Sequence, residues 1–527
     1  MKRTSSGQNG SARHAVLTVL SMVAAMVLSK GLGMVRSACM AAAYGTGWQA
    51  NAFSAASRIP LSFFDLLFSA SILGCFIPVY NSFRAEDPEH PEKAEKQADA
   101  FACIFLNFIL LLTGLFSVLG MVFARPIISL ITPGLPEETA ALAASLLRIM
   151  FPMILFTGSA YTLVGILQSK EHFLLPSLIS AISNAGVILY FIFLNGRLGE
   201  RGIWGLAFAY LGSWALQLLT LLVPLLRMRF PYRLILDFRN PALKKALRMT
   251  PPIMIGSWLA PIGILAGTHF AARLSVPGAV TIFEYAVNIE TILTGILTYG
   301  ICNFTFPRLS RMNVSGDEDS FSATARTGIL SALAIVLPVM AAVLVLSGEG
   351  TSILYQRRAF TGEDVTETAL ALRCLAVGMP AFCLSEIINR VMYAKTSVYI
   401  PMTASLIGAA VNLASSALLV RTSADTLRVG TAALGNTFGQ TACALVLLIA
   451  LIRQVPGLFS RQFLVSLAKL LFLTVCSAAV MAGVAAVLHN APAEAGLLRN
   501  LMVCAAVFAP GALLYLAGLR LLRIRFT

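Results

Sequence analysis

Two cations and two glycines interrupt the first apolar stretch of the chain, in the segment Ser29-Lys30-Gly31-Leu32-Gly33-Met34-Val35-Arg36. A cation at membrane depth costs about 2.5–3.5 kcal/mol even on insertion scales, so it usually faces a water-filled cavity that holds an anion. On a straight helix Lys30 and Arg36 lie about 120° apart, and the glycines permit a kink that turns both to one side. The alternative is that Lys30 snorkels to a headgroup and Arg36 marks the far end of the span. Because uncharged apolar residues continue from Ser37 to Tyr44, we favour a cationic pocket inside a membrane protein.

The composition places the whole chain in the membrane class. Hydrophobic residues make up 57% of the 527 positions and charged residues 12%, against about 25% charged in soluble domains. Apolar runs of about 20 residues recur along the chain, and about fourteen can be counted. We therefore predict an all-α, polytopic protein with about fourteen transmembrane helices.

The distribution of basic residues predicts the orientation. An even number of spans puts both termini on one side, and loops rich in Lys and Arg stay cytoplasmic. The most basic segments are the N-terminus, the loop 227–248 and the C-terminus, with Lys2, Arg3, Arg13, Arg520, Arg523 and Arg525 at the two ends. We expect both termini in the cytoplasm and read the net charge of +15 as a topology signal, since no basic run is interleaved with stacking aromatics as nucleic-acid binding requires.

The sequence contains no motif for disulfide, metal or nucleotide chemistry. The nine cysteines form no CxxC pair, so neither a disulfide framework nor a metal site is expected. The chain has no phosphate-binding loop of the G-x-x-x-x-G-K-[ST] type, and we expect no cofactor. Glu284 and Glu290 are acids inside a predicted span, and either could pair with a cavity cation or carry protons.

The chain repeats itself at an offset of about 225 residues. Leu147-Arg148 recurs as Leu372-Arg373, Lys170 as Lys395, and Pro176 as Pro401. Six spans per repeat give two halves of the same orientation, an arrangement in which transporters bind substrate between the halves. We predict a lobe at 1–235 (helices 1–6), a second at 236–455 (helices 7–12), and two extra helices at 456–527 that serve as a lipid-tail groove.

Ordered motifs resemble those of the MurJ/MviN family, the lipid II flippases of the multidrug/oligosaccharidyl-lipid/polysaccharide exporter superfamily. The N-terminal ones are S-K-G-L-G-M-V-R (29–36), Y-G-T-G-W-Q-A-N-A-F (44–53), S-R-I-P (57–60) and S-A-S-I-L-G-C-F-I-P-V-Y (69–80). Later ones are G-I-L-Q-S-K-E-H-F-L-L-P (165–176), F-P-R-L-S-R (306–311), L-Y-Q-R-R-A-F-T (354–361) and M-Y-A-K-T-S-V-Y-I-P (392–401). They cover most of the first twelve predicted helices.

The resemblance implies a function. It implies a transporter and not an enzyme, which moves lipid II from the cytoplasmic to the outer leaflet of the bacterial cell membrane by alternating access. The implied fold is a pair of six-helix lobes around a cationic cavity, with the last two helices holding the polyprenyl tail. The implied partners are lipid II or a related polyprenyl-diphosphate glycolipid, membrane lipids and, as a candidate, the cell-wall synthesis machinery.

The resemblance also implies site residues, with departures. Family arginines from spans one, two and eight are thought to hold the diphosphate; Arg36 occupies the first position and Lys30 a second basic one in span one, whereas the others fall on Phe64 and Asn288. Arg58, on a usually basic position, is a partial substitute. Asn51, on a usually acidic position, and Asn288 are expected to donate hydrogen bonds, although an interhelical bond explains Asn288 equally well. The acid associated with sodium in some members aligns near Gly267, which leaves diphosphate geometry and sodium coupling open.

Several alternatives remain. The missing second and third arginines favour an exporter of another undecaprenyl-diphosphate-linked glycan. A cation-coupled multidrug exporter would need acids in the first lobe, which Lys30 and Arg36 argue against. A membrane glycosyltransferase would need a catalytic acidic pair on a large external loop, and a silent scaffold would keep buried cations without benefit.

Overall fold

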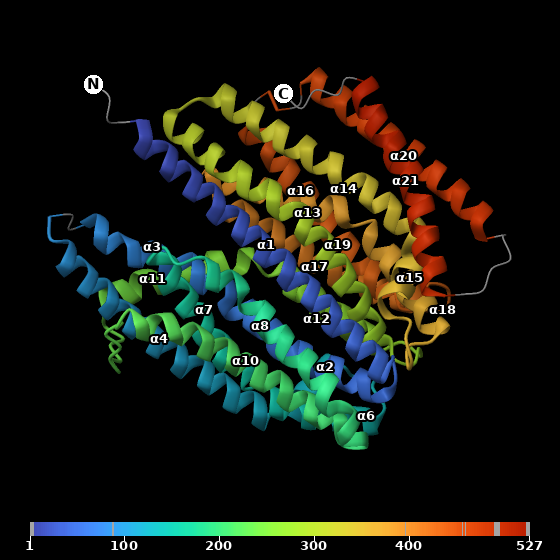
Figure 1. The fold of residues 1–527 in the computed structure, drawn as a ribbon, viewed down its shortest axis with the longest axis horizontal. Coiled ribbons are helices and arrows are strands. Elements are labelled where there is room, and N and C mark those ends of the chain that lie inside the picture. The colour runs from blue at the N-terminus through green and yellow to red at the C-terminus, as the bar shows by residue number, and fades with distance from the viewer. Residues whose placement is uncertain are drawn as a thin grey trace. The chain divides into compact units, whose positions relative to one another are not determined.

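The computed structural model describes residues 5–86, 89–395, 397–455, 457–458, 460–489 and 496–522, and every regular element in this part of the chain is helical (Figure 1). The all-α prediction is confirmed. The elements of the first half are α1 (Ser5–Tyr44), α2 (Trp48–Phe64), the π-helical η1 (Asp65–Ser69), α3 (Ala70–Glu86), α4 (Pro91–Val122), α5 (Ala124–Ile131), α6 (Glu137–Met150), α7 (Met153–Ser169), α8 (Leu174–Tyr190), η2 (Phe191–Asn195), α9 (Gly196–Leu198), η3 (Gly199–Arg201) and α10 (Gly202–Arg227).

The second half is built in the same way from long apolar helices. Its elements are α11 (Pro241–Gly256), α12 (Leu259–Ala271), α13 (Ala279–Ser315), α14 (Glu318–Tyr355), α15 (Gly362–Ala376), α16 (Met379–Ala394), α17 (Tyr399–Thr422), α18 (Ala424–Leu427), α19 (Gly430–Gln454), α20 (Arg461–His489) and α21 (Leu497–Leu521).

By length and composition, ten helical stretches in the described residues could cross a membrane, or up to twelve if each of two bent helix pairs is one span. The predicted number of about fourteen is consistent with this count but is not established by it. One of the ten, Leu174–Arg227, covers two predicted spans, and α1 contains the first predicted span. The chain is therefore a multi-pass membrane protein.

The chain divides into two compact units. The first contains 1–40, 55–130 and 137–254, and the second contains 41–54, 131–136 and 255–527. The turn after α1 and the short loop before α6 thus belong to the second unit. The lobe boundaries expected from the sequence, at 235 and 455, stay predictions.

Aromatic and small side chains hold the first unit together. The ring of Phe76 on α3 lies 5.5 Å from that of Phe101 and 5.1 Å from that of Phe105, both on α4. Gly165 on α7 lies against Phe76, and Gly158 lies against Thr113 of α4. Because these glycines carry no side chain, α7 approaches α3 and α4 closely, as helices in membranes commonly do.

The last two helices of the second unit form a tight pair. In Figure 1 α20 and α21 run side by side at the red end of the colour scale. Gly511 of α21 lies under the Met481 side chain of α20, and Ser477 donates a hydrogen bond to the Gly511 carbonyl (2.9 Å). Residues of α20 and α21 share a small buried cluster with Ala342 and Leu346 of α14. The two helices beyond the predicted repeat are therefore packed onto α14.

The internal repeat has a counterpart in local structure. Lys170 and Lys395 both cap the C-terminus of a helix, α7 and α16. Lys170 pairs with Glu95 of α4 (2.8 Å) and Lys395 pairs with Glu318 of α14 (2.9 Å). Each ammonium also faces an aromatic ring, at 5.8 Å from the Phe230 centroid and 5.0 Å from the Phe321 centroid. The matching lysines therefore occupy equivalent helix ends and make equivalent contacts in the two halves.

The predicted orientation rests in part on residues that lie outside the described ranges. These are Lys2, Arg3, Arg523 and Arg525.

Candidate functional site

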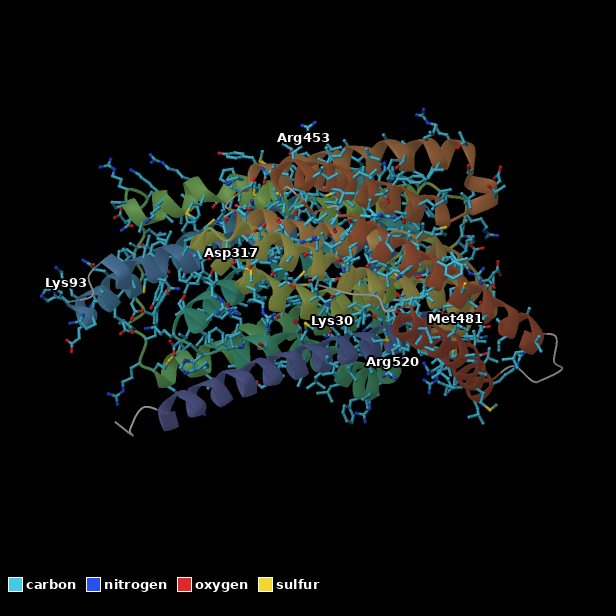
Figure 2. All side chains as sticks on the ribbon, turned by 90° about the horizontal axis from the view of Figure 1, so that it is seen from above. Lys30, Lys93, Asp317, Arg453, Met481 and Arg520 are labelled. Carbon is cyan, nitrogen blue, oxygen red and sulfur yellow. The ribbon has the colours of Figure 1, made fainter. Side chains whose placement is uncertain are left out.

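Helix α1 carries the two cations that define the candidate site. It is continuous from Ser5 to Tyr44, and Figure 2 shows it unbroken around Lys30. The expected kink at the glycines is therefore wrong, and Lys30 and Arg36 keep their separation of about 120° around the axis. Gly33 has another task, since a Cβ there would lie 3.3 Å from Asn184 Nδ2 of α8. Asn184 also donates a hydrogen bond to the Ser29 carbonyl (3.1 Å), which fixes α1 against α8.

Arg36 lies against an aromatic face. Its guanidinium carbon is 5.3 Å from the ring centroid of Tyr210 on α10. A cation over such a ring gains about 0.5–2 kcal/mol, more as water is removed. None of the described residues accepts a hydrogen bond from the buried Nε of Arg36. Since buried polar groups in native proteins are nearly always paired, Arg36 presents a donor that an anionic ligand can satisfy.

The other two cations of the first unit differ in their surroundings. Lys30 is half-buried and lies about 120° around the α1 axis from Arg36. Arg58 on α2 is also half-buried, and the carboxylate of Asp65 attracts it. A negative charge near Arg58 disfavours a phosphate there.

Phe64, the position aligned with a family arginine, is a core residue in this chain. Its side chain is 2% exposed. Its ring stacks on Phe68 at 6.0 Å and meets Tyr161 edge-on at 5.1 Å. Aromatic packing therefore determines the role of this position in this chain.

Asn51 belongs to the second unit and has a structural partner there. The backbone N–H of Thr281, in the first turn of α13, donates a hydrogen bond to Asn51 Oδ1 (3.2 Å). The N-cap residue of α13 is Gly278, which has no side chain to cap the helix. Asn51 supplies the missing cap from α2, so one of its polar atoms is already used.

Asn288, Glu284 and Glu290 are all half-buried on α13. Glu284 and Asn288 are four residues apart and share one face, whereas Glu290 lies about 120° from Glu284. Glu290 accepts a hydrogen bond from the Thr291 hydroxyl (3.5 Å). The seven predicted site residues thus fall into two sets: Lys30, Arg36 and Arg58 in the first unit, and Asn51, Glu284, Asn288 and Glu290 in the second.

Gly267, the position near which a sodium-associated acid aligns, is a packing contact. A Cβ at Gly267 of α12 would collide with the ring of Phe283 on α13, which is 1% exposed. Nearby polar residues of α17 and α19 pair with each other, and Asn412 Nδ2 donates to Asn436 Oδ1 (3.3 Å). Among the described residues, no group of three or more His, Cys, Asp or Glu side chains is placed to hold a metal ion.

Sequence reasoning missed the residues that orient α1. Asn184 and Tyr210 fix its position and the guanidinium, and both are polar residues in predominantly apolar helices. That pattern was available in the sequence, but it does not say which helix lies opposite.

Comparison with known proteins identifies the family. Residues 40–502 match the family model described as "Lipid II flippase MurJ". A "Probable lipid II flippase MurJ" from Bdellovibrio bacteriovorus is 27% identical over 424 residues, which cover 80% of each chain.

Solved structures share the fold. One described as "Lipid II flippase MurJ, inward closed conformation" matches with a TM-score of 0.77 and 19% identity, covering 96% of this chain and 98% of the other. An inward-facing multidrug resistance MATE family transporter of the MOP superfamily matches with a TM-score of 0.70 and 15% identity, covering 81% and 95%. Since the family model covers most of its length, this chain belongs to the MurJ family of lipid II flippases.

Proposed function

We propose that this protein moves lipid II from the cytoplasmic to the outer leaflet of the bacterial cell membrane, with both termini in the cytoplasm. Membership of the family supports the substrate. In this proposal a lobe at 1–235 and a lobe at 236–455 rock against each other, and the helices in 456–527 hold the polyprenyl tail. The reaction is transport, with no bond made or broken.

The surroundings of Arg36 are the observation that supports the mechanism. Its guanidinium is held against Tyr210, and its buried Nε has no acceptor among the described residues. A guanidinium offers two parallel hydrogen bonds to phosphate oxygens. We assign the diphosphate to Arg36, with Lys30 as a second charge on the same helix. Arg58, Asn51 and Asn288 are secondary contacts, and cell-wall synthesis enzymes are candidate partners.

The membrane potential can drive the step. One elementary charge gains about 2.3 kcal/mol per 100 mV, and an anion that leaves a negative interior moves downhill. Glu284 and Glu290 are the groups that would carry protons if the return of the empty protein is coupled to them.

A depletion strain tests the function. This chain should restore growth and lipid II exposure in a bacterium that is depleted of its own flippase. Arg36→Ala should abolish both at normal protein abundance, and Arg36→Lys should restore them in part because the bidentate contact is lost. Arg125→Ala is the matched control, since Arg125 and its partner Glu137 are 65% and 78% exposed. Normal transport by both Arg36→Ala and Lys30→Ala would refute the cationic site.

Orientation is tested separately. In a cysteine-free background, Arg233→Cys and Gly362→Cys should react with an impermeant thiol reagent from opposite sides of the membrane. Labelling of both from outside would contradict the proposed topology.

A second candidate is an exporter of another polyprenyl-diphosphate-linked glycan. Two positions that the resemblance aligns with family arginines favour this function. Phe64 lies in an aromatic cluster, and Asn288 lies on α13. Failure of a well-expressed chain to restore lipid II exposure, together with loss of another surface glycan on deletion in its own host, would select this function.

A further inference from the structure

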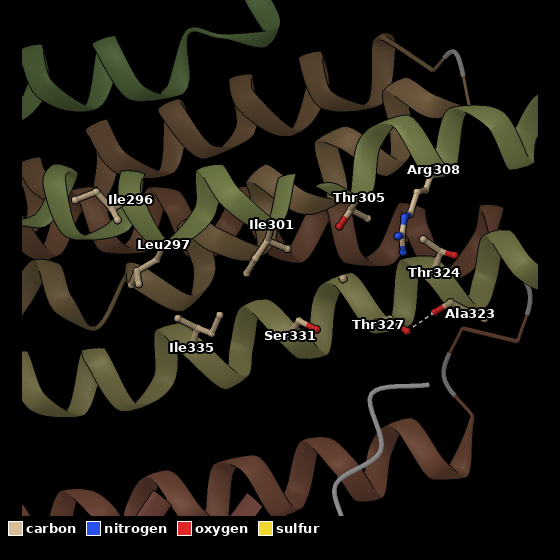
Figure 3. Close-up of a pocket in the computed structure, with 11 residues that line it drawn as sticks. Ile296, Leu297, Ile301, Thr305, Arg308, Ala323, Thr324, Thr327, Ser331 and Ile335 are labelled. Carbon is tan, nitrogen blue, oxygen red and sulfur yellow. Dashed lines mark hydrogen bonds between the residues drawn. The ribbon is translucent and has the colours of Figure 1, made fainter. Parts of the chain in front are cut away.

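A cavity of about 790 Å³ lies between α13 and α14 of the second unit. This volume is within the range of small-molecule sites. Among the residues that the structure describes, those lining the cavity come from these two helices (Figure 3): Ile296, Leu297, Ile301, Thr305, Arg308, Ala323, Thr324, Thr327, Gly328, Ser331 and Ile335.

The lining changes character along its length. At one end Ile296 and Ile335 are 38% and 42% exposed, although they are large and apolar. At the other end lie Arg308 and Thr324, and Figure 3 shows the Arg308 side chain directed toward Thr324. Arg308 is the one charged residue among the described residues that line the cavity. The cavity therefore suits a molecule with an apolar chain and an anionic head.

The dimensions match one leaflet of a bilayer. Ile296 and Arg308 are separated by twelve helical positions, which corresponds to about 18 Å along α13. Half of a hydrocarbon core is about 15 Å. The polar end lies toward Ser315 and Glu318, where α13 ends and α14 begins. A lipid in that leaflet would place its headgroup at Arg308 and its chain along the isoleucines.

The threonines make short-range contacts within the two helices, and the positive charge of Arg308 makes it the main polar determinant. Thr327 donates to the Ala323 carbonyl (2.9 Å) and Thr324 contacts the Met312 sulfur (3.2 Å). Gly328 forms the floor, since a Cβ there would lie 3.1 Å from Thr305. Basic pockets between transmembrane helices commonly bind anionic phospholipid headgroups.

We propose that this cavity is a binding site for an anionic phospholipid, with the phosphate at Arg308 and one acyl chain along Ile301, Leu297 and Ile296. All the described lining residues belong to the second unit, so the site can be argued from that unit by itself. A transported substrate must be released during the cycle, so a site within one unit favours a resident membrane lipid over the substrate.

Native mass spectrometry of the purified full-length protein tests the proposal with phosphatidylglycerol and phosphatidylcholine as probes. The protein should retain phosphatidylglycerol at concentrations at which it loses phosphatidylcholine. Arg308→Gln should weaken phosphatidylglycerol retention about fivefold, as expected for one cation near the membrane surface. Ser331→Leu, which fills the cavity without changing charge, should weaken it too.

Arg453→Gln is the matched control. Arg453 is exposed in the last turn of α19. It lies at the same end of the unit, because Lys395 contacts both Glu318 and the carbonyl of the adjacent Gln454 (3.1 Å). This variant should bind phosphatidylglycerol like the wild type. Thermal unfolding of each variant separates a lost site from a lost fold.

Two results would overturn the proposal. One is unchanged phosphatidylglycerol retention in a folded Arg308→Gln variant. The other is that the wild-type protein retains farnesyl diphosphate under conditions in which it loses phosphatidylglycerol, which would assign the cavity to a prenyl-diphosphate ligand.

Discussion

Replacing Lys170 by methionine should destabilise the first unit strongly. Lys170 lies 2.8 Å from Glu95 Oε1 and 3.1 Å from Asp99 Oδ1, and its side chain is 14% exposed. Tyr80 donates a hydrogen bond of 2.7 Å to the same Asp99 oxygen. The network thus joins α3, α4 and the end of α7.

The magnitude follows from what the substitution leaves behind. Asp99 is 9% exposed, so its carboxylate would stay buried without a cation, which costs about 3–5 kcal/mol. Glu95 is 49% exposed, and its loss of a partner adds at most about 1 kcal/mol. The total is about 3–6 kcal/mol, and a domain of this size loses about 2–4 °C in Tm per kcal/mol, so we expect a decrease of about 6–24 °C. Adding Asp99→Asn should recover much of this decrease because the buried charge is removed.

The repeat supplies a matched control. Lys395→Met removes the equivalent lysine of the second half, but its partner Glu318 is 62% exposed. Water can solvate this exposed carboxylate when the lysine is removed. The expected cost is about 1 kcal/mol or less, which corresponds to a Tm decrease of about 2–4 °C.

The assay is thermal unfolding of the purified variants in one detergent, measured as the loss of monodisperse protein in size-exclusion chromatography. A decrease for Lys170→Met no larger than that for Lys395→Met would refute the reasoning. Failure of Asp99→Asn to rescue Lys170→Met would show that lost packing, and not a buried charge, causes the effect.

Three further predictions concern other contacts. Gly511→Ala should lower Tm because the new Cβ on α21 meets the Met481 side chain of α20, at a cost of about 1–3 kcal/mol. Gly483→Ala is the control and should not lower Tm, because a Cβ there has no heavy atom within 4 Å. Equal effects of the two substitutions would contradict the packing account. Asn51→Ala should cost about 1 kcal/mol through the lost cap of α13, and an unchanged Tm would show that the cap is dispensable. The side chain and backbone N–H of Ser320 hold the pKa of Asp317 below its ordinary value. This carboxylate therefore adds stability above its unfolded-state pKa that is lost as the pH falls through the lower, folded-state pKa, and Asp317→Asn should flatten Tm against pH in that acid range.

Much of the architecture could be predicted from the sequence because a bilayer imposes simple rules. A backbone in lipid must satisfy its own hydrogen bonds, so apolar runs become helices. The paired motifs around Lys170 and Lys395 predicted a repeat, and both lysines cap helices and bind acids in the structure. The number of spans was less certain, because helices such as those in 174–227 join without a long break.

The sequence by itself determined which residues of this protein are chemically unusual: cations in an apolar helix, acids in α13, and an aromatic and an amide where the family resemblance leads us to expect arginines. Tertiary structure alone decided what each one does. Gly33 makes room for Asn184 and does not kink α1, and Asn51 caps a helix more than 200 positions away in sequence. Spacing along a chain fixes only the face of a helix on which a residue lies. The opposing helix, whose side chains satisfy or leave unsatisfied a buried polar group, depends on packing between distant segments.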